Sequence, residues 1–336
     1  MKEALFYQKE SAGKVRCGLC RFRCLIDDGN RGICAVRENR GGTLYSLVYG
    51  RVITEHVDPI EKKPLFHVMP GSSAYSIATV GCNFHCRHCQ NYSISQVERH
   101  GEIQGAHRSP ADIVRSAVGS GAGSIAYTYT EPTIFFEFAL DTARLAKEQG
   151  LRNLFVTNGY ISSEPLAAIA PVLDAANIDL KGFSESFYRE IVGAKLSEVL
   201  DSIIEYRKLG IWLEITTMII PGLNDADAEL NGIAAFIVQN LGADTPWHVS
   251  QFYPTYRLTD RPRTPVATLR RAREIGMAAG LKYVYEGNVP GEGGENSFCP
   301  SCGVVVIERY GYRIMSNRLT DGGCPDCGAK IAGIEL

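Results

Sequence analysis

Eleven cysteines, gathered in three groups, constrain this chain more than any other feature. The groups are Cys17, Cys20, Cys24 and Cys34; Cys82, Cys86 and Cys89; and Cys299, Cys302, Cys324 and Cys327. In a reducing cytosol, such spacing favours thiolates converging on a metal over disulfides. The two groups of four predict closed metal sites, and the group of three predicts an open site that leaves a position for a small molecule. Three cysteines buried as small hydrophobic residues are the alternative, which needs the spacing in all three groups to be a coincidence.

Composition and charge limit the class of protein. The 336 residues are 45% hydrophobic and 21% charged, which predicts a folded protein with a sizeable core rather than a disordered chain. Lys and Arg number 35 against 37 Asp and Glu, so the net charge of −2 gives no basic surface for nucleic acid. Because no apolar run is long enough to span a bilayer, we expect a cytoplasmic protein without membrane or nucleic-acid partners.

A repeating pattern between residues 75 and 290 predicts an α/β fold. Short β-branched runs alternate with amphipathic helices that end at glycine, as in parallel sheets with right-handed crossovers. The runs predict strands at 75–80, 124–129, 153–157, 176–180, 212–220, 246–252 and 282–286. Apolar residues at steps of three and four predict a helix over 134–149, closed by Gly150. Six or seven such units predict a full or partial barrel, with functional groups at the carboxyl ends of its strands.

Two helix starts and three domains follow from local patterns. Ser109 before Pro110 predicts an N-cap for a helix over 110–119, and Thr264 before Pro265 predicts the same for a helix that ends at Gly280. We expect a cysteine-rich β extension over 1–74, the barrel over 75–290, and a metal-binding tail over 291–336 after the glycine-rich segment GNVPGEGGEN. In the tail, Gly311 falls near the turn of a predicted hairpin.

The closed sites differ in how well their spacing predicts the metal. The two CPxCG turns, at Cys299/Cys302 and Cys324/Cys327, have the paired spacing of a zinc ribbon, and an auxiliary iron–sulfur cluster is the alternative. For Cys17, Cys20, Cys24 and Cys34 the spacing leaves zinc and a second iron–sulfur cluster open. Either metal would also hold together an extension too small to fold around its own core.

The open site has the spacing C-x3-C-x2-C directly after the first predicted barrel strand, in the segment GCNFHCRHCQN. Three thiolates can bind three irons of a [4Fe–4S] cluster and leave the fourth iron for a chelating small molecule. The alternative is zinc on the three cysteines with His85 or His88 as a fourth ligand.

This loop resembles that of the radical S-adenosylmethionine (SAM) superfamily, in which the fourth iron binds the amine and carboxylate of SAM. Further resemblance, to pyruvate formate-lyase activating enzymes, lies in YTEPT at 129–133, VTNG at 156–159 and DLK at 179–181. The chain departs from that family in having Tyr129–Thr130 where a glycine pair is usual, and His88 where an aromatic carbocycle is usual.

Across nearly its whole length the chain resembles the radical SAM member of the AmmeMemoRadiSam group, a relative of those activating enzymes. The segments that carry this resemblance include CGLCRFRC, DPIEKKPLFH, NIDLKGF, TTMIIPGLND, PWHVSQFYP and YEGNVPGEGGEN. The resemblance implies a partial (β/α)6-type barrel with a cysteine-rich N-terminal extension and a zinc-ribbon-like tail.

Polar residues at strand ends are the candidates for SAM contacts. Thr130 or Glu131 can accept from the methionine ammonium group, although Glu131 can instead cap the next helix. Asn158, Asp179, Lys181 and His248 can pair with the ribose hydroxyls. Each has a structural alternative: turn chemistry for Asn158, an ion pair between Lys181 and Asp179, and a hydrogen-bonded core position for His248.

The resemblance implies an oxidoreductase that cleaves SAM reductively and abstracts hydrogen from a substrate. That substrate is expected to be a protein, either a glycyl-radical enzyme or a Memo-like or AMMECR-like partner, with a flavodoxin or ferredoxin as one-electron donor. Two alternatives stay open: a radical SAM enzyme acting on a small molecule, and a zinc-ribbon scaffold without catalysis.

Overall fold

The computed structural model describes all residues from Met1 to Leu336, and these form two compact units. Each unit combines segments that are distant in the sequence. The first comprises Met1–Asp58, Ser73–Ala176 and Ser197–Ile211, and the second comprises Pro59–Ser72, Asn177–Leu196 and Trp212–Leu336. The sequence led us to expect three domains, over 1–74, 75–290 and 291–336. That division stays a prediction.

The first unit contains the first half of the predicted repeat. Its neighbouring strands are, in order, β8 (Thr54–Pro59), β9 (Ser73–Ala78), β11 (Ser124–Tyr127) and β12 (Arg152–Thr157), with the start of β13 (Ala175–Asp179) beyond them. β9, β11 and β12 are parallel, and Ile125 stands opposite Tyr75 and Asn153. Because all four residues of β11 are buried, this strand lies in the core of the unit.

Helices follow these strands as the sequence predicts. They are α1 (Tyr92–Ser95), α2 (Pro110–Gly119), α3 (Phe136–Glu148), α4 (Ser163–Ile169) and α6 (Leu196–Lys208), with short helices η3 (Pro132–Phe135) and η4 (Ala170–Val172). The predicted cap of α2 is confirmed: Ser109 Oγ accepts from the Asp112 N–H at 3.2 Å, and Asp112 Oδ2 accepts from the Ser109 N–H at 3.1 Å. This reciprocal pair satisfies two backbone donors that a helix start leaves free.

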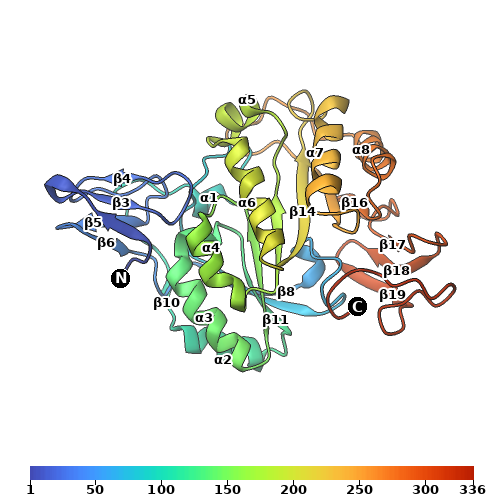
Figure 1. Cartoon of the computed structure of the whole chain (residues 1–336), viewed down its shortest axis with the longest axis horizontal. Coiled ribbons are helices and arrows are strands. Elements are labelled where there is room, and N and C mark those ends of the chain that lie inside the picture. The colour runs from blue at the N-terminus through green and yellow to red at the C-terminus, as the bar shows by residue number, and fades with distance from the viewer. The chain divides into compact units, whose positions relative to one another are not determined.

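The N-terminal extension consists of short antiparallel strands. β1 (Lys2–Glu3), β6 (Thr43–Ser46) and β5 (Arg37–Arg40) form one small sheet, and β2 (Tyr7–Lys9), β3 (Val15–Cys17) and β4 (Leu25–Ile26) form another. A helical turn, η1 (Ser11–Gly13), joins β2 to β3, and β7 (Arg51–Val52) pairs with β10 (Ala106–His107). In Figure 1, β3, β4, β5 and β6 lie at the blue end of the chain. The predicted small β extension is therefore present.

The second unit contains the other half of the repeat. After most of β13 come β14 (Trp212–Ile219), β15 (Trp247–Gln251) and β16 (Val284–Gly287), each hydrogen-bonded to the strand before it. The helical elements are η2 (Ile60–Lys62), α5 (Glu185–Phe187), η5 (Tyr188–Val192), α7 (Asp227–Asn240) and α8 (Val266–Ala278). All seven predicted strands thus occur within a few residues of their predicted bounds.

The predicted N-cap at Thr264 is wrong. Helix α8 begins after Pro265 and has no side-chain cap. The Thr264 hydroxyl instead donates to the Ile219 carbonyl at 2.5 Å and accepts from the Phe252 N–H at 2.9 Å. Because Thr264 is fully buried, its hydroxyl serves the backbone around the end of β14 rather than the helix.

The tail folds as the predicted hairpin. β17 (Ser297–Phe298), β18 (Val305–Tyr310) and β19 (Arg313–Asn317) form an antiparallel sheet, and Gly311 stands in the turn with φ of 59°. Figure 1 shows these strands at the red end of the chain. The tail packs on an apolar cluster that includes Phe66, Tyr283 and Tyr285. No helix anywhere in the chain has the length and apolar character needed to cross a membrane.

Candidate functional site

The loop that carries Cys82, Cys86 and Cys89 begins where β9 ends and runs into α1. Gly81 opens the loop with φ of 98°, a conformation that favours glycine. A Cβ atom there would also lie 2.6 Å from Val36 Cγ1 and 3.0 Å from the Cys34 carbonyl oxygen. Glycine is therefore required both for the turn and for the close approach of the N-terminal cysteine segment.

Hydrogen-bonding groups lie beside two of the three thiols of this loop, those of Cys82 and Cys89. The Phe84 N–H donates to Cys82 Sγ at 3.4 Å, and Asn158 Nδ2 stands 3.9 Å from the same sulfur. Cys89 Sγ lies 3.1 Å from Ser95 Oγ. Burial raises the pKa of Cys82 well above its usual value, and the negative charges of Glu131 and the neighbouring thiols raise it further. A bound cation would reverse this balance, because a coordinating thiol is deprotonated.

The geometry of the loop does not favour the zinc alternative. His85 is exposed, and its Nδ1 pairs with Gln96 Oε1 at 2.9 Å. His88 is buried. Neither histidine belongs with the three cysteines to a group whose ligand atoms all lie within 4.8 Å of one another, as the ligands of one zinc ion would. The three Sγ atoms do not all lie within 4.8 Å of one another, as expected where each thiolate binds a different iron of one cluster.

Glu131 lies in the segment that follows β11 and forms hydrogen bonds to the end of β12. Its Oε1 accepts from the Thr133 N–H at 3.0 Å, the Thr133 hydroxyl at 2.6 Å and the Thr157 hydroxyl at 2.7 Å. Its Oε2 accepts from the Asn158 N–H at 2.8 Å. Glu131 is 1% exposed, and burial raises its pKa against the effect of these donors. The carboxylate caps η3, which is the structural alternative considered from the sequence, and both of its oxygens are occupied.

The Tyr129–Thr130 pair stands where the resemblance noted from the sequence leads one to expect glycines. Tyr129 has φ of 63°, a left-handed conformation that favours glycine and costs a tyrosine roughly 1–2 kcal/mol. The conformation is held by hydrogen bonds: the Tyr129 carbonyl accepts from Asn91 Nδ2 at 2.7 Å, and its hydroxyl donates to Asp58 Oδ2. The Thr130 hydroxyl donates to the Thr79 carbonyl at 2.9 Å. Tyr129 thus adopts a left-handed conformation at this position without being glycine.

Asn158 lies next to the cysteine loop. Its Nδ2 donates to Asn83 Oδ1 at 2.7 Å, and its Oδ1 accepts from the Tyr160 N–H at 3.0 Å. Asn83 is fully buried, and its own amide nitrogen has no hydrogen-bond partner in the protein. The first unit therefore brings Thr130, Glu131 and Asn158 together with the C-x3-C-x2-C loop.

The other three sequence candidates lie in the second unit. Asp179 Oδ2 and Lys181 Nζ form an ion pair at 2.9 Å, as their structural alternative supposes, and their side chains are 36% and 18% exposed. His248 is 3% exposed, and its Nε2 lies 2.7 Å from Glu214 Oε2. This is the environment of a hydrogen-bonded core histidine.

Glu214 is the centre of that buried network, and sequence reasoning missed it. Besides pairing with His248, it accepts from the N–H groups of Phe66 and His67, at 3.0 Å and 2.8 Å. His67 Nε2 lies 2.6 Å from the Tyr285 hydroxyl. Burial lowers the pKa of His67 to about 4. The pKa of Glu214 is lowered because its hydrogen bond and its attraction to His248 and His67 outweigh the opposing effect of burial. The only available signal was one acidic residue within an apolar strand pattern.

The tail cysteines form a compact group. The Sγ atoms of Cys299, Cys302, Cys324 and Cys327 all lie within 4.8 Å of one another. Cys299 and Cys327 are 3.6 Å apart, and Cys302 and Cys324 are 3.7 Å apart. The predicted metal-binding tail thus has its four ligands gathered around one point.

Comparison of the sequence with known proteins identifies a family and several relatives. Residues 76–230 match the Radical SAM superfamily. The uncharacterized protein MJ0808 of Methanocaldococcus jannaschii is 47% identical over 333 residues, which are 98% of this chain and 99% of that protein. Pyruvate formate-lyase 1-activating enzyme of Escherichia coli K12 is 22% identical over 166 residues, which are 46% of this chain and 65% of that enzyme.

Among solved structures, Streptococcus suis SuiB bound to S-adenosylmethionine has a similar fold. It aligns with a TM-score of 0.51 and 14% identity, covering 68% of this chain and 52% of SuiB. The cysteine loop, the fold that presents it and the extended match together show that the chain belongs to the radical SAM superfamily.

Proposed function

We propose that this protein holds a [4Fe–4S] cluster on Cys82, Cys86 and Cys89, cleaves SAM reductively there, and abstracts hydrogen from a substrate protein. The observation that carries the proposal is the placement of three thiols in the loop after the carboxyl end of β9, with Cys82 beside the Phe84 N–H and Asn158. A reduced cluster of this kind supplies one electron to the sulfonium of SAM, which yields methionine and a 5′-deoxyadenosyl radical.

The chain's own residues hold and shield such a cluster. The Phe84 N–H and the Ser95 hydroxyl stabilise thiolates at Cys82 and Cys89. An aromatic cluster closes one side of the loop: Phe84 packs on Tyr160 at 5.1 Å between ring centroids, and Phe22 packs on Tyr160 at 4.8 Å. Exclusion of water matters here, because a carbon radical must meet only its intended hydrogen donor.

The proposed SAM contacts remain Thr130, Glu131, Asn158, Asp179, Lys181 and His248. They differ in how available they are. Asp179 and Lys181 keep 36% and 18% of their side chains exposed, whereas Glu131 and His248 keep only 1% and 3% of their surface. A direct contact of Glu131 or His248 with SAM requires that these side chains give up their present hydrogen bonds. Without that exchange, Glu131 acts on the site by accepting a hydrogen bond from the Asn158 N–H and so positioning Asn158.

Zinc is the metal proposed for the tail. A tetrahedron built from Zn–S bonds of about 2.3 Å has edges of about 3.8 Å. The sulfur separations of 3.6 Å and 3.7 Å in this group are close to that length. A structural zinc ion therefore fits this group better than an auxiliary iron–sulfur cluster does.

The substrate proposed is a protein, with a flavodoxin or ferredoxin as the one-electron donor. Support comes from a relative whose name is pyruvate formate-lyase 1-activating enzyme. Two partner classes follow from the resemblances: a glycyl-radical enzyme, and a Memo-like or AMMECR-like protein. A small-molecule substrate is the second candidate, because no feature of the cysteine loop itself selects a polypeptide.

Anaerobic reconstitution tests the chemistry. The protein is loaded with iron and sulfide, reduced with dithionite and supplied with SAM, and 5′-deoxyadenosine is measured by chromatography. We expect the product from the parent and none from the Cys82→Ala/Cys86→Ala/Cys89→Ala variant, in which the tail zinc is retained as a control for folding. Zinc instead of iron at the central site, with no 5′-deoxyadenosine, would leave the non-catalytic scaffold as the function.

A second experiment tests the substrate class. The reduced enzyme and SAM are incubated with candidate partner proteins, which are then examined by electron paramagnetic resonance for a glycyl radical and by mass spectrometry for a modification. Robust turnover of a free metabolite without any protein present would refute the protein-substrate assignment while leaving the radical chemistry intact.

A further inference from the structure

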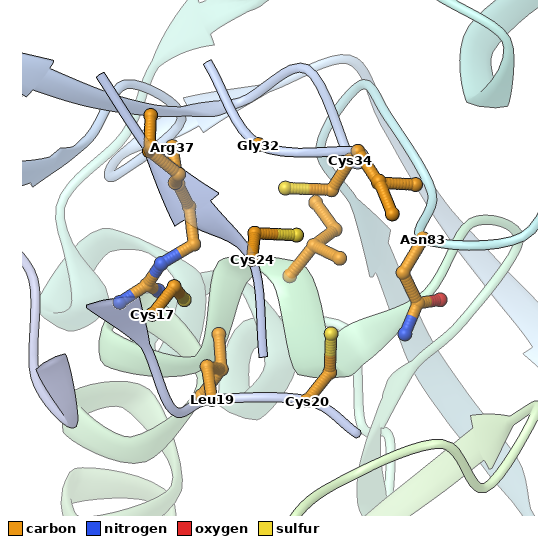
Figure 2. A pocket seen from close by; sticks show the side chains of 11 residues that line it. Cys17, Leu19, Cys20, Cys24, Gly32, Cys34, Arg37 and Asn83 are labelled. Carbon is orange, nitrogen blue, oxygen red and sulfur yellow. The ribbon is translucent and has the colours of Figure 1, made fainter. Parts of the chain in front are cut away.

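Cys17, Cys20, Cys24 and Cys34 line a cavity in the first unit. The space between these side chains is partly open to solvent. Figure 2 shows the sulfur atoms of Cys20, Cys24 and Cys34 directed into a common space, with Cys17 beside the guanidinium group of Arg37. The remaining walls are mostly apolar side chains, from Leu19, Ile26, Ile33 and Ile134.

This arrangement differs from that of the tail. The tail sulfurs all lie within 4.8 Å of one another, and the four N-terminal sulfurs do not form such a group. One zinc ion needs its four thiolates as close together as those of the tail. In a [4Fe–4S] cluster each thiolate binds a different iron, so the sulfurs stand further apart around an inorganic core that fills the space between them. The cysteines of the Cys82 loop also form no compact group.

Backbone donors already serve the thiols. The backbone of Phe22, Ile33 and Val36 forms hydrogen bonds to the thiols of Cys20, Cys24 and Cys34. Donors of this kind, close in sequence to the cysteine that they serve, support thiolates bound to a metal.

Two further buried donors in the cavity wall have no partner. Arg37 is 1% exposed; its terminal nitrogens bind Glu137 and the Leu5 carbonyl, but its Nε has no acceptor. Asn83 is fully buried, and its Nδ2 has no acceptor either. A buried N–H group without a hydrogen-bond partner is destabilising. Both residues line the cavity, so an occupant that accepts hydrogen bonds would remove this cost.

We propose that Cys17, Cys20, Cys24 and Cys34 ligate a second [4Fe–4S] cluster, whose sulfur atoms accept hydrogen bonds from Arg37 and Asn83. The separated thiols supply the four ligands around the common space into which Cys20, Cys24 and Cys34 point. Arg37, which also pairs with Glu137, places its guanidinium group beside Cys17. All of these residues belong to the first unit, and none of them depends on SAM chemistry elsewhere in the chain.

The test uses the full-length Cys82→Ala/Cys86→Ala/Cys89→Ala variant, which removes the other cluster and so isolates this site. After anaerobic loading with iron and sulfide, we expect about four irons, four sulfides and one zinc per chain, with the Mössbauer spectrum of a [4Fe–4S] cluster. Adding Cys17→Ser, Cys20→Ser, Cys24→Ser and Cys34→Ser should remove the iron and keep the zinc. A chain that binds two zinc ions and no iron, or only the tail zinc, would overturn the proposal.

A gentler substitution covers the case in which the four-serine variant fails to fold. Arg37→Lys keeps the positive charge opposite Glu137 and removes the Nε donor. In the triple-alanine background this variant should keep its full iron content and show a lower reduction potential, because hydrogen bonds to cluster sulfurs raise that potential. Lys62→Arg, outside the cavity lining, is the matched control and should leave the potential unchanged. An unchanged potential in Arg37→Lys would refute the assigned hydrogen bond.

Discussion

At the scale of single residues, Glu131 controls the turn that follows β11. Four donors converge on its buried carboxylate. In Glu131→Gln the amide nitrogen must face at least one of those donors, which leaves a buried group unpaired. We expect the free energy of unfolding, measured in urea, to fall by about 1–3 kcal/mol, with weaker SAM binding as a result.

Thr133→Val is the matched control for that substitution. It removes one hydroxyl donor to Glu131 and keeps the carboxylate, so its effect should be smaller, at about 1 kcal/mol. Equal stability of the parent and Glu131→Gln would show that the carboxylate does not organise the turn.

The lowered pKa of His67 leads us to expect that the free energy of unfolding depends on pH. Its pKa is lowered from 6.5 to about 4 by burial, so between these pH values the unfolded chain takes up a proton that the folded chain does not. Folding is therefore destabilised as the pH falls, by an amount on the order of 3 kcal/mol at pH 4. The lowered pKa of Glu214 acts in the same direction, because its contribution is present above the usual carboxyl pKa and is lost on acidification.

Urea unfolding at several pH values between 7 and 5 checks this expectation. The parent should lose stability steadily across that range, and His67→Gln should show a flatter profile because glutamine does not titrate. Parallel profiles for the two proteins would mean that His67 is not the group responsible.

The same residues show where sequence reasoning ends. The cysteine spacing predicted all three thiol groups, because residues that are close in sequence form a pattern that can be recognised without the structure. The pair of Arg37 and Glu137, joined at 3.0 Å with both side chains buried, was not predicted. Two charged residues far apart in the sequence become partners only through tertiary packing, and neither lies in a motif.

At the scale of elements, a capping residue in the sequence predicts the start of a helix only where tertiary contacts do not take up its side chain. Ser109 caps α2 as expected, and its hydroxyl stays within the cap: it accepts from the Asp112 N–H and donates to Asp112 Oδ2 at 2.7 Å. Thr264 has the same sequence signature, yet its buried hydroxyl is taken by backbone groups of two other segments. The period of the apolar residues was the more reliable guide, since it depends on the core face and not on one side chain.

The tail hairpin should depend on its metal. Cys299 and Cys324 are buried in the same apolar cluster as Val306 and Ile307 of β18. Removing the metal with a chelator, or by Cys302→Ser/Cys327→Ser, leaves the hairpin with little core of its own. We expect faster amide hydrogen exchange across β18 and β19 and unchanged exchange in β11, measured by mass spectrometry. Identical exchange with and without metal would show that apolar packing alone holds the tail.

At the scale of the whole molecule, the proposed open cluster predicts sensitivity to oxygen. A cluster with one iron free of protein ligands is exposed to oxidation. We expect air to bleach the absorbance of the reconstituted protein and to abolish 5′-deoxyadenosine formation, whereas the tail zinc should be retained. Full SAM cleavage by protein purified in air would contradict this expectation.

Asn83 has a consequence for how substitutions combine. It follows Cys82 in the chain, bonds to Asn158 and lines the N-terminal cysteine cavity, while Gly81 touches the segment of Cys34. Sites that share residues are not energetically independent. A double-mutant cycle between Cys20→Ser and Asn158→Ala should therefore give a coupling energy of about 0.5 kcal/mol or more in urea unfolding. The same cycle between Cys20→Ser and Glu164→Ala, at an exposed position on α4, should be additive. A substitution in one cysteine group therefore changes the stability of the protein in which a substitution in the other group acts.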